Sequence, residues 1–296
     1  MSHVAHWDDV EPHRRESGHI AGNWYDLGRA AGSVAVGLKR ILVDSGKWST
    51  PAHAEGAEEE IFFVLGGSGL SWQDGEVFEV GESDALVHLP EQHAHTLRAG
   101  PDGLDVLAYG QRKTQGNTVL PRAGVAWMHP SWVDVGGPSP WEREAAVGEP
   151  EVGDVSPRPG RIADVSQGIS WTLDTGAVDL NLGDVVGSVE TGLSHMRIPP
   201  GGEGYPPHCH AAEEELFVVL EGSGTVTLGD ESGEVRRGSV VSRPAGTQIA
   251  HSFRAGNEGL AYLAYGTREP NDVVYYPRTD EIRFRGVGVT LPAGRR

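Results

Sequence analysis

Three imidazoles and one carboxylate stand in the second half of the chain at spacings that could bring them together. His208 and His210 lie two residues apart, and Glu215 and then His251 follow downstream. On a β-strand, residues two apart point to the same face, so both imidazoles would point one way and Cys209 the other. Imidazole and carboxylate ligands suit a divalent first-row metal. The pattern therefore predicts a metal site built from the three histidines and Glu215.

The first half of the chain carries a second version of this pattern. The segment HAEGAEEEIFFVLGGSG, residues 53 to 69, matches HCHAAEEELFVVLEGSG, residues 208 to 224, at an offset of 155 residues (208 − 53 = 155). Farther on, the segments that begin at His95 and His251 match at an offset of 156 (251 − 95 = 156). A period this long indicates two copies of one domain.

The first copy differs at one of the four candidate ligand positions. Its set is His53, Glu55, Glu60 and His95, and Glu55 stands where the second copy has His210. A working site with two carboxylates would favour a harder ion. The alternative is a site that has lost its metal, in a barrel kept for stability or dimerisation. Both interpretations stay open at the level of the sequence.

The signals between these residues are those of β-strands. The runs IFFVL and LFVVL are β-branched and aromatic, and we expect the Gly-x-Gly segments after them to be turns. We therefore predict an all-β chain of two tandem antiparallel units, each a β-barrel or a sandwich, with Phe62, Val64, Phe217 and Val219 in their cores. Residues 1–130 would form an N-terminal barrel with a leading arm, 131–161 a linker, and 162–296 a C-terminal barrel. The linker could contain one helical turn near PWEREAAV.

These spacings resemble the cupin family, and the duplication makes the chain similar to a bicupin. The first cupin motif is Gly, five residues, His-x-His, three or four residues, Glu, six residues, Gly. The second copy meets it with Gly202, His208, His210, Glu215 and Gly222. Gly238, Pro244 and Gly246 match the second cupin motif. In that motif two residues separate the last of these glycines from a histidine, whereas four residues separate Gly246 from His251 here. In the first copy, Lys47 replaces the leading Gly of the first motif.

The resemblance implies barrels of the jelly-roll, double-stranded β-helix type and a divalent ion with open coordination positions. Iron or manganese is favoured, with nickel or zinc as alternatives. It implies a dioxygenase-like oxidoreductase acting on a small organic molecule in the C-terminal barrel, with Glu215 as a ligand that could also act as a base. A non-redox isomerase, lyase or decarboxylase is one alternative, and a non-catalytic binder or sensor is another. Weaker candidates for the pocket are Tyr205, Gln248, Tyr265 and His93.

Composition limits the remaining possibilities. The 296 residues carry a net charge of −18, which argues against a nucleic-acid partner. A single cysteine excludes internal disulfides, and no apolar run approaches the roughly 20 residues of a membrane span. We therefore expect a cytoplasmic protein with no membrane partner, and a homodimer is possible. We also expect the strand NDVVYYPR to pack against the partner barrel or another subunit.

Overall fold

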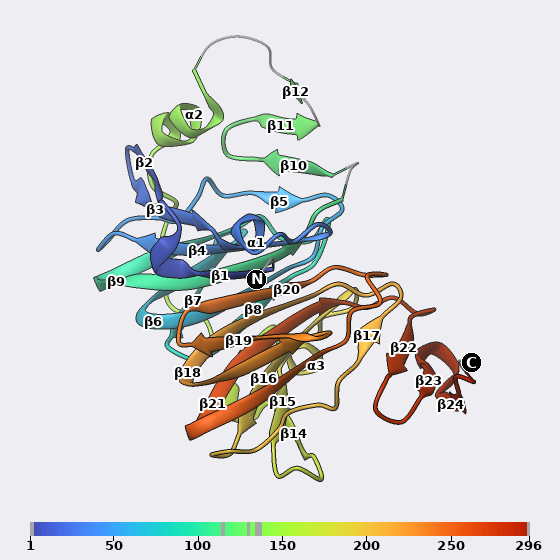
Figure 1. Cartoon of the computed structure of the whole chain (residues 1–296). Coiled ribbons are helices and arrows are strands. Elements are labelled where there is room, and N and C mark those ends of the chain that lie inside the picture. The colour runs from blue at the N-terminus through green and yellow to red at the C-terminus, as the bar shows by residue number, and fades with distance from the viewer. Residues whose placement is uncertain (1–2, 114–115, 129–130, 134–137, 295–296) are drawn as a thin grey trace.

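The computed structural model describes residues 3–113, 116–128, 131–133 and 138–294, and these form two β-barrels that lie side by side (Figure 1). In each barrel, a large antiparallel sheet of eight strands is accompanied by a small sheet of four. The predicted all-β chain with two tandem antiparallel barrels is confirmed. No helix in the described part of the chain has the length and apolar character that a bilayer crossing requires.

The first barrel takes most of its strands from the first half of the chain. Its large sheet contains β2 (His13–Ser17), β3 (Ile20–Asp26), β4 (Val36–Val43), β6 (Glu60–Gln73), β7 (Glu76–Gly81), β8 (Asp84–His88), β9 (His95–Gln111) and β13 (Ile162–Asp164). Their order is β13-β8-β6-β9-β4-β3-β2, and β7 pairs with β6. The small sheet contains β5 (Ala54–Glu55), β10 (Asn117–Leu120), β11 (Val125–Met128) and β12 (Ser131–Trp132), in the order β12-β11-β10-β5.

The second barrel repeats this arrangement. Its large sheet contains β1 (Val4–His6), β14 (Ile169–Thr172), β15 (Val178–Asn181), β16 (Thr191–Ile198), β18 (Glu215–Leu228), β19 (Glu231–Arg236), β20 (Ser239–Arg243) and β21 (His251–Thr267). The order is β1-β20-β18-β21-β16-β15-β14, with β19 on β18. The small sheet contains β17 (Cys209–His210), β22 (Val273–Tyr276), β23 (Glu281–Phe284) and β24 (Val289–Pro292), in that order.

Short helices connect the strands. The α-helices are α1 (Leu27–Ala30), α2 (Pro140–Val147) and α3 (Gly183–Val186), and the 3-10 helices are η1 (Trp7–Asp9), η2 (Val165–Gln167) and η3 (Arg285–Val287). The expected helical turn in the linker is α2, which a capping box between Ser139 and Glu142 begins. Its Glu144 is fully buried, with a carboxylate oxygen 3.0 Å from Arg122 Nη1. This pairing fastens the linker to the first barrel.

The two barrels exchange their outermost strands. The arm strand β1 pairs with β20 of the second barrel, with Val4 opposite Val241. Strand β13, which follows the linker, pairs with β8 of the first barrel, with Ile162 opposite Leu86. Each large sheet is therefore completed by a segment from the other side of the linker.

The Gly-x-Gly segments are not turns, so that prediction was wrong. Strands β6 and β18 continue through them, and their pairing with β9 and β21 shifts register at these residues. Gly67 and Gly222 have φ values of 81° and 72°, and an added Cβ would collide with a carbonyl of the neighbouring strand. Each segment is a β-bulge, which bends a long strand without ending it.

The runs IFFVL and LFVVL are apolar on both faces because both faces are buried. Phe62, Val64, Phe217 and Val219 lie in the cores of their own barrels, as predicted. The alternate residues of the same strands lie in a third core between the barrels, and they are Ile61, Phe63, Leu216 and Val218. Tyr109 and Tyr265 meet in this third core, with ring centroids 4.8 Å apart.

Two buried carboxylates cross the junction between the barrels. Glu214 of the second barrel accepts hydrogen bonds from the Ser33 hydroxyl and the Val34 amide, both at 2.8 Å, and from the Ala35 amide. In the reciprocal arrangement, Glu59 of the first barrel accepts from groups between residues 188 and 191 of the second, including the Ser188 hydroxyl at 2.5 Å. The two barrels are thus joined by charge-assisted hydrogen bonds as well as by an apolar core.

We expect Glu214→Ala to lower the free energy of unfolding by about 3 kcal/mol, because it removes the acceptor of three donors of the first barrel that are buried or partly buried. Urea unfolding measures this loss. Glu221→Ala is the matched control, since Glu221 lies on the same strand with an exposed side chain. Equal unfolding curves for the two variants would mean that the crossing carboxylates do not hold the barrels together.

Candidate metal centres

The structure brings the four candidate ligands of the second barrel together. His251 Nε2 lies 3.1 Å, His210 Nε2 3.3 Å and His208 Nε2 4.0 Å from Glu215 Oε2. Glu215 and His251 are the first residues of β18 and β21, and His208 forms a bridge with His251 just before β17. The shared face predicted for His208 and His210 is therefore the face toward Glu215.

Hydrogen bonds on the far side of two rings orient this cluster. His208 Nδ1 lies 2.8 Å from the Pro206 carbonyl oxygen, and His210 Nδ1 lies 2.7 Å from Asp272 Oδ2. A carbonyl or carboxylate at Nδ1 accepts the ring proton, which leaves the lone pair on Nε2. Both rings thus direct Nε2 at Glu215. Asp272, which orients this candidate ligand, was not predicted from the sequence.

Charge and burial adapt the same residues to ligation. Burial, together with the neighbouring His251, lowers the pKa of His208 to about 3, so its imidazole is neutral. Burial alone would raise the pKa of Glu215, but His210 and His251 lower it below its usual range. In addition, His210 Nε2 and Glu215 Oε2 are buried without a hydrogen-bond partner. Three imidazoles and a carboxylate with orphaned, converging atoms fit a divalent metal ion.

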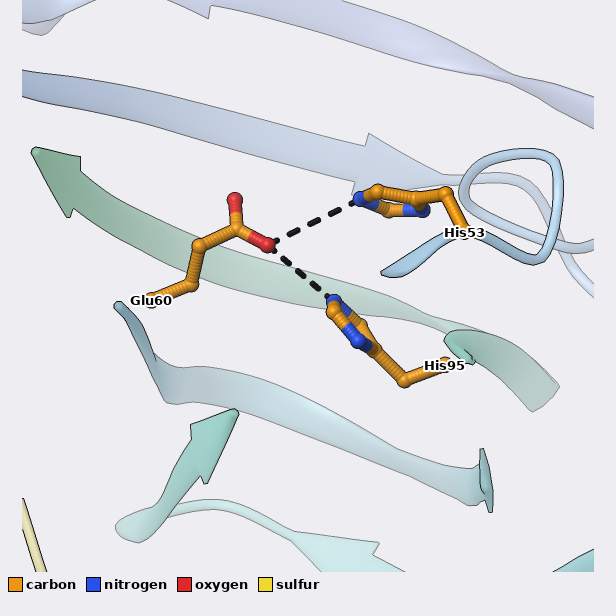
Figure 2. Close-up of side chains that lie close together, drawn as sticks. All are labelled: His53, Glu60 and His95. Carbon is orange, nitrogen blue, oxygen red and sulfur yellow. Dashed lines mark hydrogen bonds and ion pairs between the residues drawn. The ribbon is translucent and has the colours of Figure 1, made fainter. Parts of the chain in front are cut away.

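The first barrel gathers its histidines around a carboxylate in the same way. Figure 2 shows His53 and His95 pointing at Glu60, with Nε2 atoms 3.7 Å and 3.1 Å from Glu60 Oε2. His53 Nδ1 lies 2.9 Å from the Pro51 carbonyl oxygen, which matches the support of His208. Glu55 Oε1 lies 4.0 Å from His53 Nε2, so the fourth candidate also faces the cluster.

The change from His210 to Glu55 is accompanied by changes in its neighbours. The register pairs His210 with Val274 and Glu55 with Thr118, and the offset of 156 makes Thr118 the counterpart of Val274. Thr118 donates a hydrogen bond of 2.8 Å to Glu55 Oε2, whereas the counterpart of Asp272 is Gly116 (272 − 116 = 156). The first barrel therefore lacks the carboxylate acceptor that supports the imidazole of His210, and it has instead a hydroxyl donor that supports the carboxylate of Glu55. Glu55 is thus held in place toward the cluster.

Two side chains of the first cluster have raised pKa values, whereas the pKa of His208 in the second is lowered, so protons compete with a metal ion more strongly in the first barrel. Burial would lower the pKa of His53, but Glu60 raises it to about 9. Burial and the charge of Glu60 raise the pKa of Glu55 to about 7. Burial alone would raise the pKa of Glu60, but the imidazoles of His53 and His95 lower it well below its usual range. An ion at this site would have to displace protons from His53 and Glu55.

One further histidine belongs to the first cluster and was not predicted. His88 stacks on His95 with ring centroids 3.6 Å apart, and burial holds its pKa well below the usual range. Its counterpart in the second barrel is Arg243 (243 − 88 = 155). Both residues end the strand that pairs with the ligand glutamate. Comparing the two halves position by position would have marked this place.

A cavity of about 340 Å³ adjoins the cluster of the second barrel. Its lining includes His208, His210, Glu215 and His251, with aromatic and apolar side chains beside them and arginines from the end of the chain. Two of the weaker candidates line it. The Tyr205 hydroxyl donates to Asp179 Oδ2 at 2.8 Å, and Tyr265 reaches it from the core between the barrels.

The other two weaker candidates lie elsewhere. Gln248 is exposed in a loop, with a φ of 60°, and is not part of the cavity wall. His93 is 43% exposed and pairs with Asp74, 3.2 Å away, so its ring does not join the cluster of His95. His93 lies before the strand, which begins only at His95.

The segment NDVVYYPR contains the predicted strand, β22, which is built into its own barrel rather than packed against the other one. It pairs with β17 and β23 of its own barrel, and Val274 and Tyr276 line the cavity. The apolar character of this segment is evident in the sequence, and the structure shows that two of its side chains line the cavity.

Comparisons with known proteins agree with this architecture. Residues 194–264 match the Cupin_2 family model, which describes a cupin domain. An uncharacterized protein of Streptomyces coelicolor is 42% identical over 57 residues, which is 19% of this chain and 50% of that protein. The matched segment thus spans half of the length of this relative.

Two solved structures extend the likeness to both barrels. Oxalate decarboxylase of Lactobacillus farciminis, in a formate complex, is similar with a TM-score of 0.62 and 15% identity, over 90% of this chain and 86% of that one. Oxalate decarboxylase of Bacillus subtilis, which has Mn(II) centres, gives 0.61 and 14%, over 91% and 78%. Residues 194–264 are thus similar to a cupin domain, and the two barrels together share the fold of these oxalate decarboxylases. At these identities the solved structures establish the fold alone.

We expect wild-type protein to hold about two divalent ions per chain, because each cluster offers four ligand side chains. His210→Ala should remove the ion of the second barrel and Glu55→Ala that of the first, as measured by elemental analysis after dialysis. Cys209→Ala is the control, since Cys209 adjoins the second cluster but does not line its cavity. One ion per chain, lost only with His210→Ala, would make the first cluster a structural relic.

Metal retention should depend on pH differently in the two barrels. His53, with a pKa of about 9, and Glu55, at about 7, are protonated in mild acid, so the first site should lose its ion as the pH falls through this range. His208, with a pKa of about 3, stays neutral there, and only His210 opposes binding in the second barrel. Metal analysis of His53→Ala and His210→Ala variants, dialysed at a series of pH values, separates the two curves. Coincident curves would contradict this assignment.

Proposed function

We propose that the protein is a metal-dependent enzyme that acts on a small organic molecule in its second barrel. The observation that carries this proposal is the cavity of about 340 Å³ whose wall includes all four candidate ligands. A volume of this size suits a small molecule, and few polar groups beside apolar walls are typical of such sites.

The residues of the second barrel have distinct roles in this proposal. His208, His210, Glu215 and His251 hold the ion, and Asp272 fixes the ring of His210. Phe217 and Tyr262 line the cavity beside the cluster and limit the access of water. A bound divalent ion supplies Lewis acidity, and iron or manganese also supplies a redox couple. Glu215 is the one carboxylate at the centre of the cluster and the catalytic candidate.

The reaction class that we favour is a dioxygenase-like oxidation. The ligand set leaves open positions on an ion of five or six coordination, and the cavity beside it has apolar and aromatic walls. Decarboxylation is the second candidate, and the fold shared with two oxalate decarboxylases, of which that of Bacillus subtilis has Mn(II) centres, motivates it. Fold alone does not choose between these reactions, because the function depends on the rest of the pocket.

Gas exchange distinguishes the two reactions. We expect the iron-loaded protein, given a panel of small organic acids and phenols, to consume dioxygen in proportion to substrate. The double variant His208→Ala/His210→Ala should lose turnover by at least about 100-fold, because it removes two ligands. Release of carbon dioxide without net dioxygen uptake by the manganese-loaded protein would instead identify a decarboxylase.

The variant His53→Ala tests the division of labour between the barrels. It should retain turnover, because His53 serves only the first cluster. Turnover that survives the double variant but is abolished by His53→Ala would overturn the assignment of chemistry to the second barrel.

A further inference from the structure

The small sheet of the second barrel forms one wall of the cavity. Its register places His210 opposite Val274 and Val274 opposite Arg283, across β17, β22 and β23. Directly opposite residues of antiparallel strands project from the same face of a sheet. All three side chains accordingly line the cavity, in a row that runs from the cluster toward solvent.

Three arginines line this cavity, and two of them are neutralised. Arg268 pairs with Asp184, and Arg285 pairs with Glu213. Arg283 forms no ion pair with any carboxylate in the described part of the chain, and its side chain is exposed. In a protein with a net charge of −18, an unpaired guanidinium facing a binding cavity is a local reversal of charge.

The acidic groups of the cavity are engaged with other partners. Glu213 pairs with Arg285, Asp179 accepts from Tyr205, and Glu215 lies among the three imidazoles. None of them compensates the charge of Arg283. An anion that entered the cavity would therefore meet this guanidinium as its available partner.

The first barrel lacks this feature at the equivalent place. Its row runs from Glu55 to Thr118 to Trp127, and the offset of 156 makes Trp127 the counterpart of Arg283 (283 − 127 = 156). The first row therefore begins with an acid and ends with an indole, whereas the second begins with an imidazole and ends with a guanidinium. The difference lies in the wall of the pocket as well as at the ligand position.

We propose that Arg283 is a specificity-determining residue that binds a carboxylate, or an anionic group of the same shape, on the substrate of the second barrel. This inference rests on the proposed function of that barrel. A guanidinium binds a carboxylate through two parallel hydrogen bonds, which fixes orientation as well as charge. Two strand spacings of about 4.8 Å separate the backbones of His210 and Arg283. A small acid can thus reach the cluster and Arg283 together.

Calorimetric titration of the manganese-loaded protein tests this inference without any turnover. The probes are glycolate, malonate and succinate, each paired with its neutral amide. We expect at least one acid to bind more tightly than its amide. Arg283→Gln should weaken the binding of that acid by about 10- to 100-fold and leave the affinity for the amide unchanged. Arg283→Lys, which keeps the charge but loses the planar fork, should fall between the two.

Arg254→Gln is the matched control, because Arg254 lies on the same barrel, is 65% exposed and does not line the cavity. The inference is overturned if no acid of the panel binds better than its amide, or if Arg283→Gln binds acids as wild type does. Those results leave the proposed function intact when His208→Ala/His210→Ala still abolishes turnover. Conversely, Arg283→Gln could weaken acid binding while turnover survives in the double histidine variant. That result would contradict the proposed function but not the role of Arg283.

Discussion

The docking of the two barrels depends on carboxylates that adjoin the candidate ligands in the sequence. Glu59 precedes Glu60, and Glu214 precedes Glu215, at the start of equivalent strands. Because successive side chains of a strand point to opposite faces, one carboxylate of each pair enters the other barrel and the next one enters its own cluster. The buried hydrogen bonds of the junction therefore fix the strand end that presents the ligand. Stability and metal geometry share one short segment in each half.

Much of this architecture could be predicted from the sequence because it follows from short periods and from the repeat. The period of two placed His208 and His210 on one face, and the duplication supplied the second cluster. The exchange of β1 and β13 could not be predicted, since each strand has only three residues and carries no pattern of its own. The β-bulges at Gly67 and Gly222 were mistaken for turns, because a positive φ serves either structure.

The supporting residues were harder to find than the ligands. Asp272 lies 62 residues from His210 in the chain, and only the pairing of β17 with β22 brings them together. Comparison of the halves would have helped, because Gly116 and Thr118 change in step with Glu55. A carboxylate that lost its donor, or an imidazole that lost its acceptor, would be a buried group without a partner, which is costly. Such paired replacements mark positions that work together.

The strand exchange also limits the order in which the barrels can fold during synthesis. Residues 4–6 are synthesised well before their partner strand β20, which lies more than two hundred residues downstream. The first barrel, in turn, receives its last strand only after the linker has been made. Neither barrel can complete its large sheet before the linker and the strand beyond it have been made, and the arm has no partner strand until β20 has been synthesised. A gene fragment that encodes either half alone would yield a sheet with a missing edge strand.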